Sequence, residues 1–274
     1  MSVQKTKRNI TRILTAILFN LMVMLTKSDI KYIQSLAHKK FRDSERLFVL
    51  EGVKIVRELL DQSSDGIKTI FAVGSWIEQY GSDVPAGVDL VEVASFELEK
   101  ISFLQQPNDV LALVRIPTER VAIADAPGVT LVLDKVQDPG NLGTIIRTCD
   151  WFGVEQIACS LDTADAFNPK VVQSAMGSIM RINIFYTELT RFISSYKHTP
   201  VYAAVLDGES VFETSFAGPV ILVIGNESRG ISDEVLSLVS HKITIPGKGR
   251  AESLNAAVAN AIILAEITKA SFKS

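Results

Sequence analysis

The sequence of 274 residues predicts two α/β domains, of which the second is built on a parallel β-sheet. Short apolar runs typical of buried strands alternate with helical patterns from residue 28 onwards, as they do in parallel α/β proteins. The length fits two domains, each with its own core. Residues 117–128 contain Pro117, Pro127 and Gly128 and are typical of a linker between residues 26–116 and residues 129–274.

The N-terminal segment, residues 1–25, is expected to be either a leader or a misplaced start of translation. Basic residues between Lys5 and Arg12 precede an apolar run from Ile13 to Leu25, as in a signal peptide. That run has 13 residues, which is too short for a membrane-spanning helix, and no small-residue cleavage site follows it. We expect translation to start at Met24. We expect no membrane association, because no other segment approaches the roughly 18 apolar residues of a span.

The first domain is expected to begin with a helix that Ser28 caps and that turns Ile30, Ile33 and Leu36 to one face. Short apolar runs then predict four strands, and helical patterns predict two helices between them. The expected strands are 47–50, 69–73, 90–93 and 110–116, and the expected helices are 53–60 and 95–101.

The second domain opens with a continuous apolar strand and alternates strands with helices, which predicts a parallel sheet covered on both faces. Ligand sites in such sheets lie beyond the carboxyl ends of the strands. The expected strands are 129–133, 156–159, 182–185, 201–205, 219–224 and 242–245, and the expected helices are 142–152, 168–177, 232–239 and 252–271.

The first motif follows strand 129–133. Asp138-Pro139-Gly140 is a strong turn signal, Asn141 can cap the next helix, and Gly143 allows close approach of another backbone. Arg147 follows on the same helix, so Asn141 and Arg147 are both expected near its N-terminal end. An ordinary capped helix with a surface arginine would look the same.

The second motif runs directly on from strand 219–224 as Gly225-Asn226-Glu227-Ser228-Arg229-Gly230. Two glycines around one carboxylate indicate a tight backbone loop at a ligand. The middle glycine of a dinucleotide-binding fingerprint is missing. A plain turn between a strand and a helix is the alternative interpretation.

The third motif is a loop rich in glycine and basic residues, 246–250, followed by Ser253, Leu254 and Asn255. Ser253 is expected to cap the last helix. The apolar stripe of that helix is expected to consist of Leu254, Ala257, Val258, Ala261 and Ile262. The spacing excludes a Walker phosphate-binding loop.

The order of the three motifs carries more information than any one of them. Together they resemble the signatures of the SpoU (TrmH-type) family of the SPOUT superfamily, which are RNA ribose 2′-O-methyltransferases. The matching runs are Asn141-Leu142-Gly143-x-Ile145-x-Arg147-Thr148, Gly225-Asn226-Glu227-x-x-Gly230-Ile231 and Ser253-Leu254-Asn255-x-x-x-Ala259. The resemblance implies a trefoil knot in residues 129–274, an L30-like RNA-binding domain in residues 26–116 and a homodimer.

The resemblance also implies a cofactor, S-adenosyl-L-methionine, and a set of site residues. The cofactor-binding positions that correspond are Gly225, Ile245 and Leu254. The catalytic positions that correspond are Arg147, Asn141, Glu227, Ser253 and Asn255. No metal site is expected, because Cys149 and Cys159 lack a metal-binding spacing and the three histidines are scattered. The chain departs from the family pattern at Ser228 and in the loop 246–249.

The charge distribution agrees with an RNA partner although the net charge is −3. Residues 1–60 carry twelve Lys and Arg against five Asp and Glu. Lys39, Lys40, Arg42 and Arg46 are the candidates for phosphate contacts. The L30-like domain favours ribosomal RNA in the cytoplasm over transfer RNA. A tRNA 2′-O-methyltransferase and a non-catalytic ribosome-binding factor of the same fold remain alternatives, and an oxidoreductase is disfavoured because the chain lacks a Gly-x-Gly-x-x-Gly motif.

Overall fold

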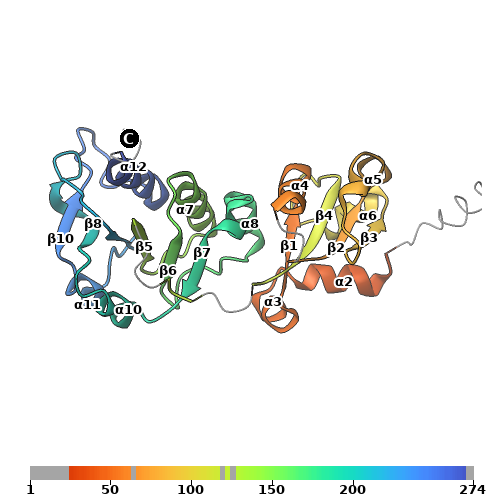
Figure 1. Ribbon diagram of the computed structural model, residues 1–274, viewed down its shortest axis with the longest axis horizontal. Coiled ribbons are helices and arrows are strands. Elements are labelled where there is room, and N and C mark those ends of the chain that lie inside the picture. The colour runs from red at the N-terminus through yellow and green to blue at the C-terminus, as the bar shows by residue number, and fades with distance from the viewer. Residues whose placement is uncertain (1–24, 63–65, 118–120, 124–127, 270–274) are drawn as a thin grey trace, which may run out of the picture. The chain divides into compact units, whose positions relative to one another are not determined.

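A computed structural model describes residues 25–62, 66–117, 121–123 and 128–269, so the expected leader or misplaced start within residues 1–24 lies outside it. The chain forms two compact units, and the boundary between them along the sequence falls between Arg115 and Ile116 (Figure 1). Among the described residues, no helix is both long enough and apolar enough to cross a bilayer.

The N-terminal unit is a four-stranded sheet with the order β1-β4-β2-β3 and helices packed around it. β4 is antiparallel to β1 and β2, and β3 is parallel to β2. The sequence predicted all four strands but not α5. The elements are α2 (Lys27–Ser35), α3 (Lys39–Glu45), β1 (Leu47–Glu51), α4 (Val53–Gln62), β2 (Ile67–Ala72), α5 (Gly74–Tyr80), the 3₁₀ turn η2 (Gly81–Asp83), β3 (Asp89–Glu92), α6 (Ser95–Ile101) and β4 (Val110–Arg115).

The first helix begins two residues earlier than its sequence pattern predicts. The hydroxyl of Thr26 accepts a hydrogen bond from the backbone N–H of Asp29 at 3.1 Å, and the Asp29 carboxylate accepts one from the Thr26 N–H at 3.0 Å. This reciprocal pair is a capping box. The expected cap at Ser28 is therefore wrong. The expected burial of Ile33 and Leu36 is confirmed.

One of the expected RNA contacts, Arg42, is wrong. Its side chain is only 2% exposed, and Nη1 donates hydrogen bonds of 2.7 Å to the backbone carbonyls of Leu36 and Ala37. Those carbonyls lie at the end of α2, so Arg42 fixes the turn between α2 and α3 and cannot bind a phosphate. Lys39, Lys40 and Arg46 are exposed.

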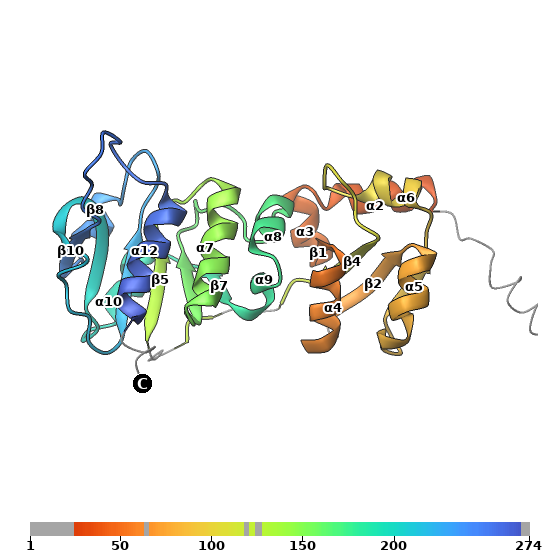
Figure 2. The same cartoon turned by 90° about the horizontal axis from the view of Figure 1, so that it is seen from above.

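The C-terminal unit is a six-stranded sheet with the order β10-β8-β9-β5-β6-β7, and every pair of neighbours is parallel. α7 and α12 lie on one face of this sheet and α10 and α11 on the other, as Figures 1 and 2 show. The predicted parallel α/β fold is confirmed. The elements are β5 (Val129–Leu133), α7 (Pro139–Trp151), β6 (Gln156–Cys159), α8 (Pro169–Ala175), α9 (Ser178–Arg181), β7 (Asn183–Tyr186), α10 (Leu189–Ser195), β8 (Val201–Ser210), β9 (Val220–Ile224), α11 (Asp233–Leu236), β10 (His241–Thr244) and α12 (Ala256–Thr268).

Two helix starts in this unit differ from the prediction. α7 is capped by Asp138, whose Oδ1 accepts from the Asn141 N–H at 2.8 Å, rather than by Asn141 itself. α12 is capped by Asn255 rather than by Ser253. In both helices the side chain of the residue directly before the first turn accepts hydrogen bonds from the free N–H groups of that turn.

The buried face of α12 also differs from the expected stripe. Leu254 and Val258 are about half exposed, at 48% and 47%. α12 begins at Ala256, four residues after the expected start at 252, so Leu254 lies in the preceding loop. The buried residues of α12 are Ala256, Ala257, Asn260, Ile263 and Leu264.

α7 and α8 pack unusually closely at Gly143. A Cβ atom on Gly143 would stand 2.5 Å from Ser174 Cβ, 2.6 Å from the Val171 carbonyl oxygen and 3.0 Å from the Ala175 nitrogen. Only glycine fits there, which confirms the expected close backbone approach.

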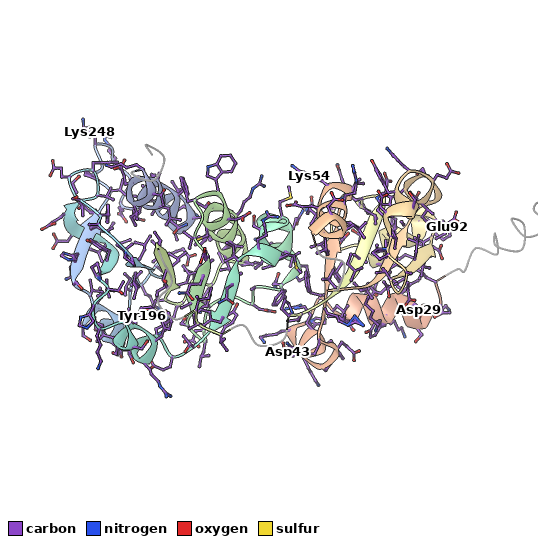
Figure 3. The ribbon with its side chains drawn as sticks, in the orientation of Figure 1. Asp29, Asp43, Lys54, Glu92, Tyr196 and Lys248 are labelled. Atoms are coloured by element: carbon purple, nitrogen blue, oxygen red, sulfur yellow. The ribbon has the colours of Figure 1, made fainter. Side chains whose placement is uncertain are left out.

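The described part of the expected linker is bound to the C-terminal unit. The backbone N–H of Ile123 donates to Gln156 Oε1 at 2.9 Å, and its carbonyl accepts from the hydroxyl of Tyr196, labelled in Figure 3, at 3.1 Å. Gln156 is fully buried, so it anchors this stretch of chain.

Candidate active site

The three sequence motifs meet at one edge of the C-terminal sheet. α7 follows the carboxyl end of β5, the loop 225–232 follows β9, and the loop 245–255 follows β10. β5 and β9 are neighbours; β6 and β7 extend the sheet on the side of β5, and β8 and β10 lie on the side of β9. The carboxyl edge between two such halves is the usual ligand site of parallel α/β sheets.

A chain of side-chain hydrogen bonds joins one residue from each motif. Asn255 Nδ2 donates to Asn141 Oδ1 at 2.8 Å, and Asn141 Nδ2 donates to Glu227 Oε1 at 2.8 Å. The directions are determined, since a carboxylate only accepts and Asn255 Oδ1 already accepts from the N–H groups of Ala257 and Val258. Glu227 and Asn255 are 86 and 114 positions from Asn141 in the sequence, and these hydrogen bonds hold both of them against it.

Arg147 and Ser253, the other two expected catalytic residues, are exposed and lie outside this hydrogen-bonded chain. Arg147 follows Asn141 on α7 by six residues, which corresponds to about 9 Å along the helix axis. The structure therefore joins Asn141, Glu227 and Asn255 directly and places the Arg147 guanidinium further along the same helix.

The loop of the second motif is closed by its own backbone. Asn226 and Gly230 exchange two backbone hydrogen bonds of 2.9 Å, and Gly230 adopts a positive φ of 71°. A Cβ on Gly225 would stand 2.4 Å from the Gly230 carbonyl carbon, so glycine is required at both positions. The loop is tight, as predicted, and its closure holds Glu227 at the tip.

Two residues that the sequence analysis missed fix this loop to the sheet. Asp134 is buried at the end of β5, and its Oδ2 accepts from the N–H of Ser232 at 2.7 Å and from the hydroxyl of Ser232 at 2.6 Å. Asn226 Nδ2 donates to the Lys135 carbonyl at 2.8 Å. The available signal was a carboxylate placed directly after a continuous apolar strand, where burial requires a partner.

The three expected cofactor-binding positions lie in the loops at this edge. Gly225 and Ile245 are partly exposed, and Leu254 is 48% exposed immediately before Asn255. An exposed apolar side chain together with the peptide groups of two loops offers contacts to a flat, partly apolar nucleoside. The residues present therefore fit S-adenosyl-L-methionine.

A second cation stands at the start of α7. Lys170 Nζ lies 3.8 Å from Asp138 Oδ2, in an ion pair whose side chains are 61% and 49% exposed. Asp138 is the cap that accepts from the N–H of Asn141. Lys170 could not be predicted, because nothing in the sequence shows that α8 packs beside the start of α7.

A parallel α/β sheet with a polar site at its carboxyl edge is the usual arrangement of an α/β enzyme that binds a nucleotide-like ligand. More particularly, the chain belongs to the SpoU rRNA Methylase family, whose family model matches residues 128–265. Residues 27–112 match the MRM3-like substrate binding domain. The chain is thus an RNA 2′-O-methyltransferase that uses S-adenosyl-L-methionine.

Individual relatives agree with this assignment. The chain is 32% identical over 229 residues to the 23S rRNA (guanosine(2553)-2′-O)-methyltransferase RlmP of Bacillus subtilis, covering 82% of this chain and 90% of that protein. An AdoMet-bound rRNA methyltransferase from Sinorhizobium meliloti is 32% identical with a TM-score of 0.81, covering 90% of this chain and 97% of that chain. A TrmH-family protein from Porphyromonas gingivalis is 36% identical with a TM-score of 0.81, covering 90% and 100%.

Proposed function

We propose that this methyltransferase modifies a ribose 2′-OH in ribosomal RNA. The observation that carries the proposal is the hydrogen-bonded chain of Asn255, Asn141 and Glu227 at the edge of the sheet. The relatives from Bacillus subtilis and Streptomyces viridochromogenes are both named as 23S rRNA 2′-O-methyltransferases, which supports ribosomal over transfer RNA.

The cofactor supplies a methyl group on a sulfonium, which is already a good leaving group. The protein has to hold the ribose hydroxyl in line with that methyl group, and positioning of this kind can supply several kcal/mol of the barrier. Asn141 and Asn255 hold the Glu227 carboxylate in one orientation, so that it can accept a hydrogen bond from a ribose hydroxyl. Ser253 hydrogen-bonds the RNA and steadies the loop. Gly225, Ile245 and Leu254 bind the cofactor.

Arg147 acts on the substrate rather than as a base. A guanidinium stays protonated at physiological pH, so it is a poor acceptor for the hydroxyl proton. Its exposed position along α7 suits a phosphate of the bound RNA. A cation there lowers the cost of forming the alkoxide during methyl transfer.

RNA binding falls to residues 26–116, which act as a separate substrate-binding domain joined through the linker 117–128 to the methyltransferase domain 129–274. The exposed cations Lys39, Lys40 and Arg46 contact the phosphate backbone. Phosphate contacts set affinity and register, while the sequence is read from unstacked bases.

The enzyme is a homodimer located in the cytoplasm, and its methyltransferase domain contains a trefoil knot. Support for the dimer comes from exposed apolar residues on the helices of one sheet face. Trp151 on α7 is 81% exposed and Val258 on α12 is 47% exposed. Exposed aromatic and aliphatic side chains are enriched at interfaces between subunits.

The test of the proposed function is a map of ribose 2′-O-methylation across total RNA from wild-type cells and from a deletion strain. One site lost in ribosomal RNA is the expected result. A site lost in transfer RNA would overturn the choice of substrate. No lost site, with S-adenosyl-L-methionine still bound by the purified protein, would favour a non-catalytic ribosome-binding factor.

The role of Arg147 has its own test. Arg147→Ala should abolish methyl transfer and change the Kd for S-adenosyl-L-methionine by less than about twofold, because the guanidinium binds RNA rather than cofactor. Arg191→Ala is the matched control, since Arg191 is exposed on α10 at the opposite face of the sheet. Unchanged turnover of Arg147→Ala would refute the assignment.

A further inference from the structure

Lys170 is a cation beside the start of α7 that the methylation mechanism above does not use. Its Cε atom would lie 3.6 Å from a Cβ built on Gly140, the residue next to Asn141. Its ammonium group is 3.8 Å from Asp138 Oδ2, and Asp138 Oδ1 accepts a hydrogen bond from the Asn141 N–H. Lys170 thus stands at the N-terminal end of α7, and Arg147 lies about two turns further along the same helix.

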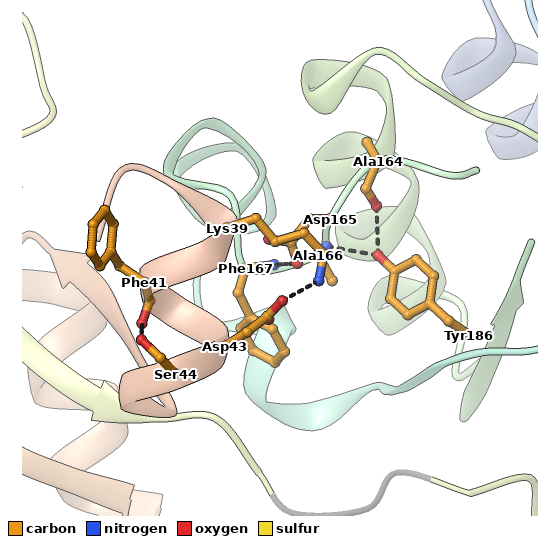
Figure 4. A network of polar contacts seen from close by, with 9 residues as sticks. All are labelled: Lys39, Phe41, Asp43, Ser44, Ala164, Asp165, Ala166, Phe167 and Tyr186. Carbon is orange, nitrogen blue, oxygen red and sulfur yellow. Dashed lines mark hydrogen bonds and ion pairs between the residues drawn. The ribbon is translucent and has the colours of Figure 1, made fainter. Parts of the chain in front are cut away.

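The position of Lys170 is fixed by the packing of the segment that carries it. α8 is locked against α7 by the close approach at Gly143. The preceding loop is held by Tyr186, whose hydroxyl donates to the Ala164 carbonyl at 2.5 Å and accepts from the Ala166 N–H at 2.8 Å (Figure 4). The backbone that carries Lys170 is therefore held in one place, which limits the space that its ammonium group can reach.

The ion pair with Asp138 does not account for this arrangement. At 3.8 Å, with both side chains largely exposed, such a pair adds little to stability. Asp138 and Glu227 make this edge of the sheet negative close to Asn141. An RNA phosphate that enters beside Asp138 therefore requires a nearby cation to offset these carboxylates, and Lys170 stands there.

We propose that Lys170 binds a backbone phosphate of the RNA next to the ribose that is methylated, while Arg147 binds the neighbouring phosphate. This inference rests on the proposed function. It assigns Lys170 a role in binding and positioning the RNA, not in binding the cofactor or in accepting the hydroxyl proton.

The test compares Lys170→Gln, Lys170→Arg and the wild-type full-length protein. Methyl transfer from labelled S-adenosyl-L-methionine is measured on total RNA from a deletion strain, which contains the unmodified target. Lys170→Gln should raise the KM for RNA about tenfold, leave the KM for the cofactor unchanged and lower kcat less than about threefold. Lys170→Arg should restore most of the affinity, because it keeps the charge.

The dependence of RNA binding on salt separates a phosphate contact from a structural role. The slope of log K against log salt should fall by about 0.7 in Lys170→Gln, as one phosphate contact of a single strand is lost. Lys197→Gln is the matched control, because Lys197 is exposed just before β8, at the opposite edge of the sheet. It should change neither the KM nor the slope by a comparable amount.

Two results would overturn the inference while leaving the proposed function intact. One is a Lys170→Gln enzyme with the wild-type KM for RNA and the wild-type salt slope. The other is a loss of activity that Lys170→Arg shares fully, which would indicate a packing role. If the wild-type protein transfers no methyl group to RNA, the proposed function fails and this inference fails with it.

Discussion

Replacement of Gly143 by alanine should force α7 and α8 apart. The new Cβ would stand 2.5 to 3.0 Å from three atoms of α8, two of which belong to its backbone. Ordinary contacts between such atoms are about 3.5–4.0 Å, so the helices would have to separate by roughly 1 Å. Backbone atoms cannot rotate away as a flexible side chain can.

The expected cost follows from two opposing terms. Overpacking of this severity costs about 3 kcal/mol, at the upper end of its usual range. The higher helix propensity of alanine than of glycine adds about 1 kcal/mol to the stability. The free energy of unfolding of the C-terminal unit should therefore fall by about 2 kcal/mol, which corresponds to a decrease in Tm of about 4–8 °C.

Differential scanning calorimetry of the full-length chain measures this effect. The transition of the C-terminal unit is the one that S-adenosyl-L-methionine raises, since a ligand stabilises the unit that binds it. Gly247→Ala is the control, because a Cβ at Gly247 would meet no atom within 4 Å. An unchanged or raised Tm for Gly143→Ala would refute the close packing of the helices. The Gly143→Ala enzyme should also show a raised KM for RNA, because Lys170 moves with α8.

Three further predictions concern the stability of the fold. Burial raises the pKa of the Cys149 and Cys159 thiols, so both should react with iodoacetamide at pH 8 at least about a hundredfold more slowly than a free thiol, as mass spectrometry would show; rapid labelling of the folded protein would contradict their burial. Hydrogen bonds from Arg181 hold the pKa of the Asp150 carboxyl below its usual value, so the pair should stabilise the protein above about pH 4 and lose this contribution as the pH falls through the lowered pKa. Urea titrations should accordingly show Asp150→Asn about 1 kcal/mol less stable than the wild type at pH 7, with the difference shrinking towards pH 3, and a difference independent of pH would count against the ion pair. Arg42→Gln should lower the stability of the N-terminal unit by about 2 kcal/mol and leave the salt dependence of RNA binding unchanged, whereas a reduced salt slope would restore Arg42 as a phosphate contact.

The strands could be predicted because buried parallel strands are continuous apolar runs, and Val129–Leu133 and Val220–Ile224 have no competing interpretation. Short helices were harder. α5 (Gly74–Tyr80) and α10 (Leu189–Ser195) have seven residues each, too few for a clear period. Arg42 was misplaced for another reason. Its partners are backbone carbonyls of the preceding turn, which leave no trace in the amino-acid pattern.

The site could be predicted where each motif contains its own residues. Asn141, Glu227 and Asn255 are joined by hydrogen bonds in the structure, although nothing in the sequence measures the distance between them. Lys170 could not be predicted from a motif. It belongs to none of the three motifs, and it stands beside Asp138 because Gly143 lets α8 approach α7 so closely.

The hydrogen bond from Asn255 to Asn141 has a consequence for the time at which the enzyme becomes active. The two residues are 114 positions apart. At a synthesis rate of about 5–20 residues per second, roughly 6–23 s pass between the addition of the first residue and that of the second. During that interval the nascent chain gains β6 to β10 but has no complete site. The growing chain is therefore inactive until Asn255 and the start of α12 have been added and have reached Asn141.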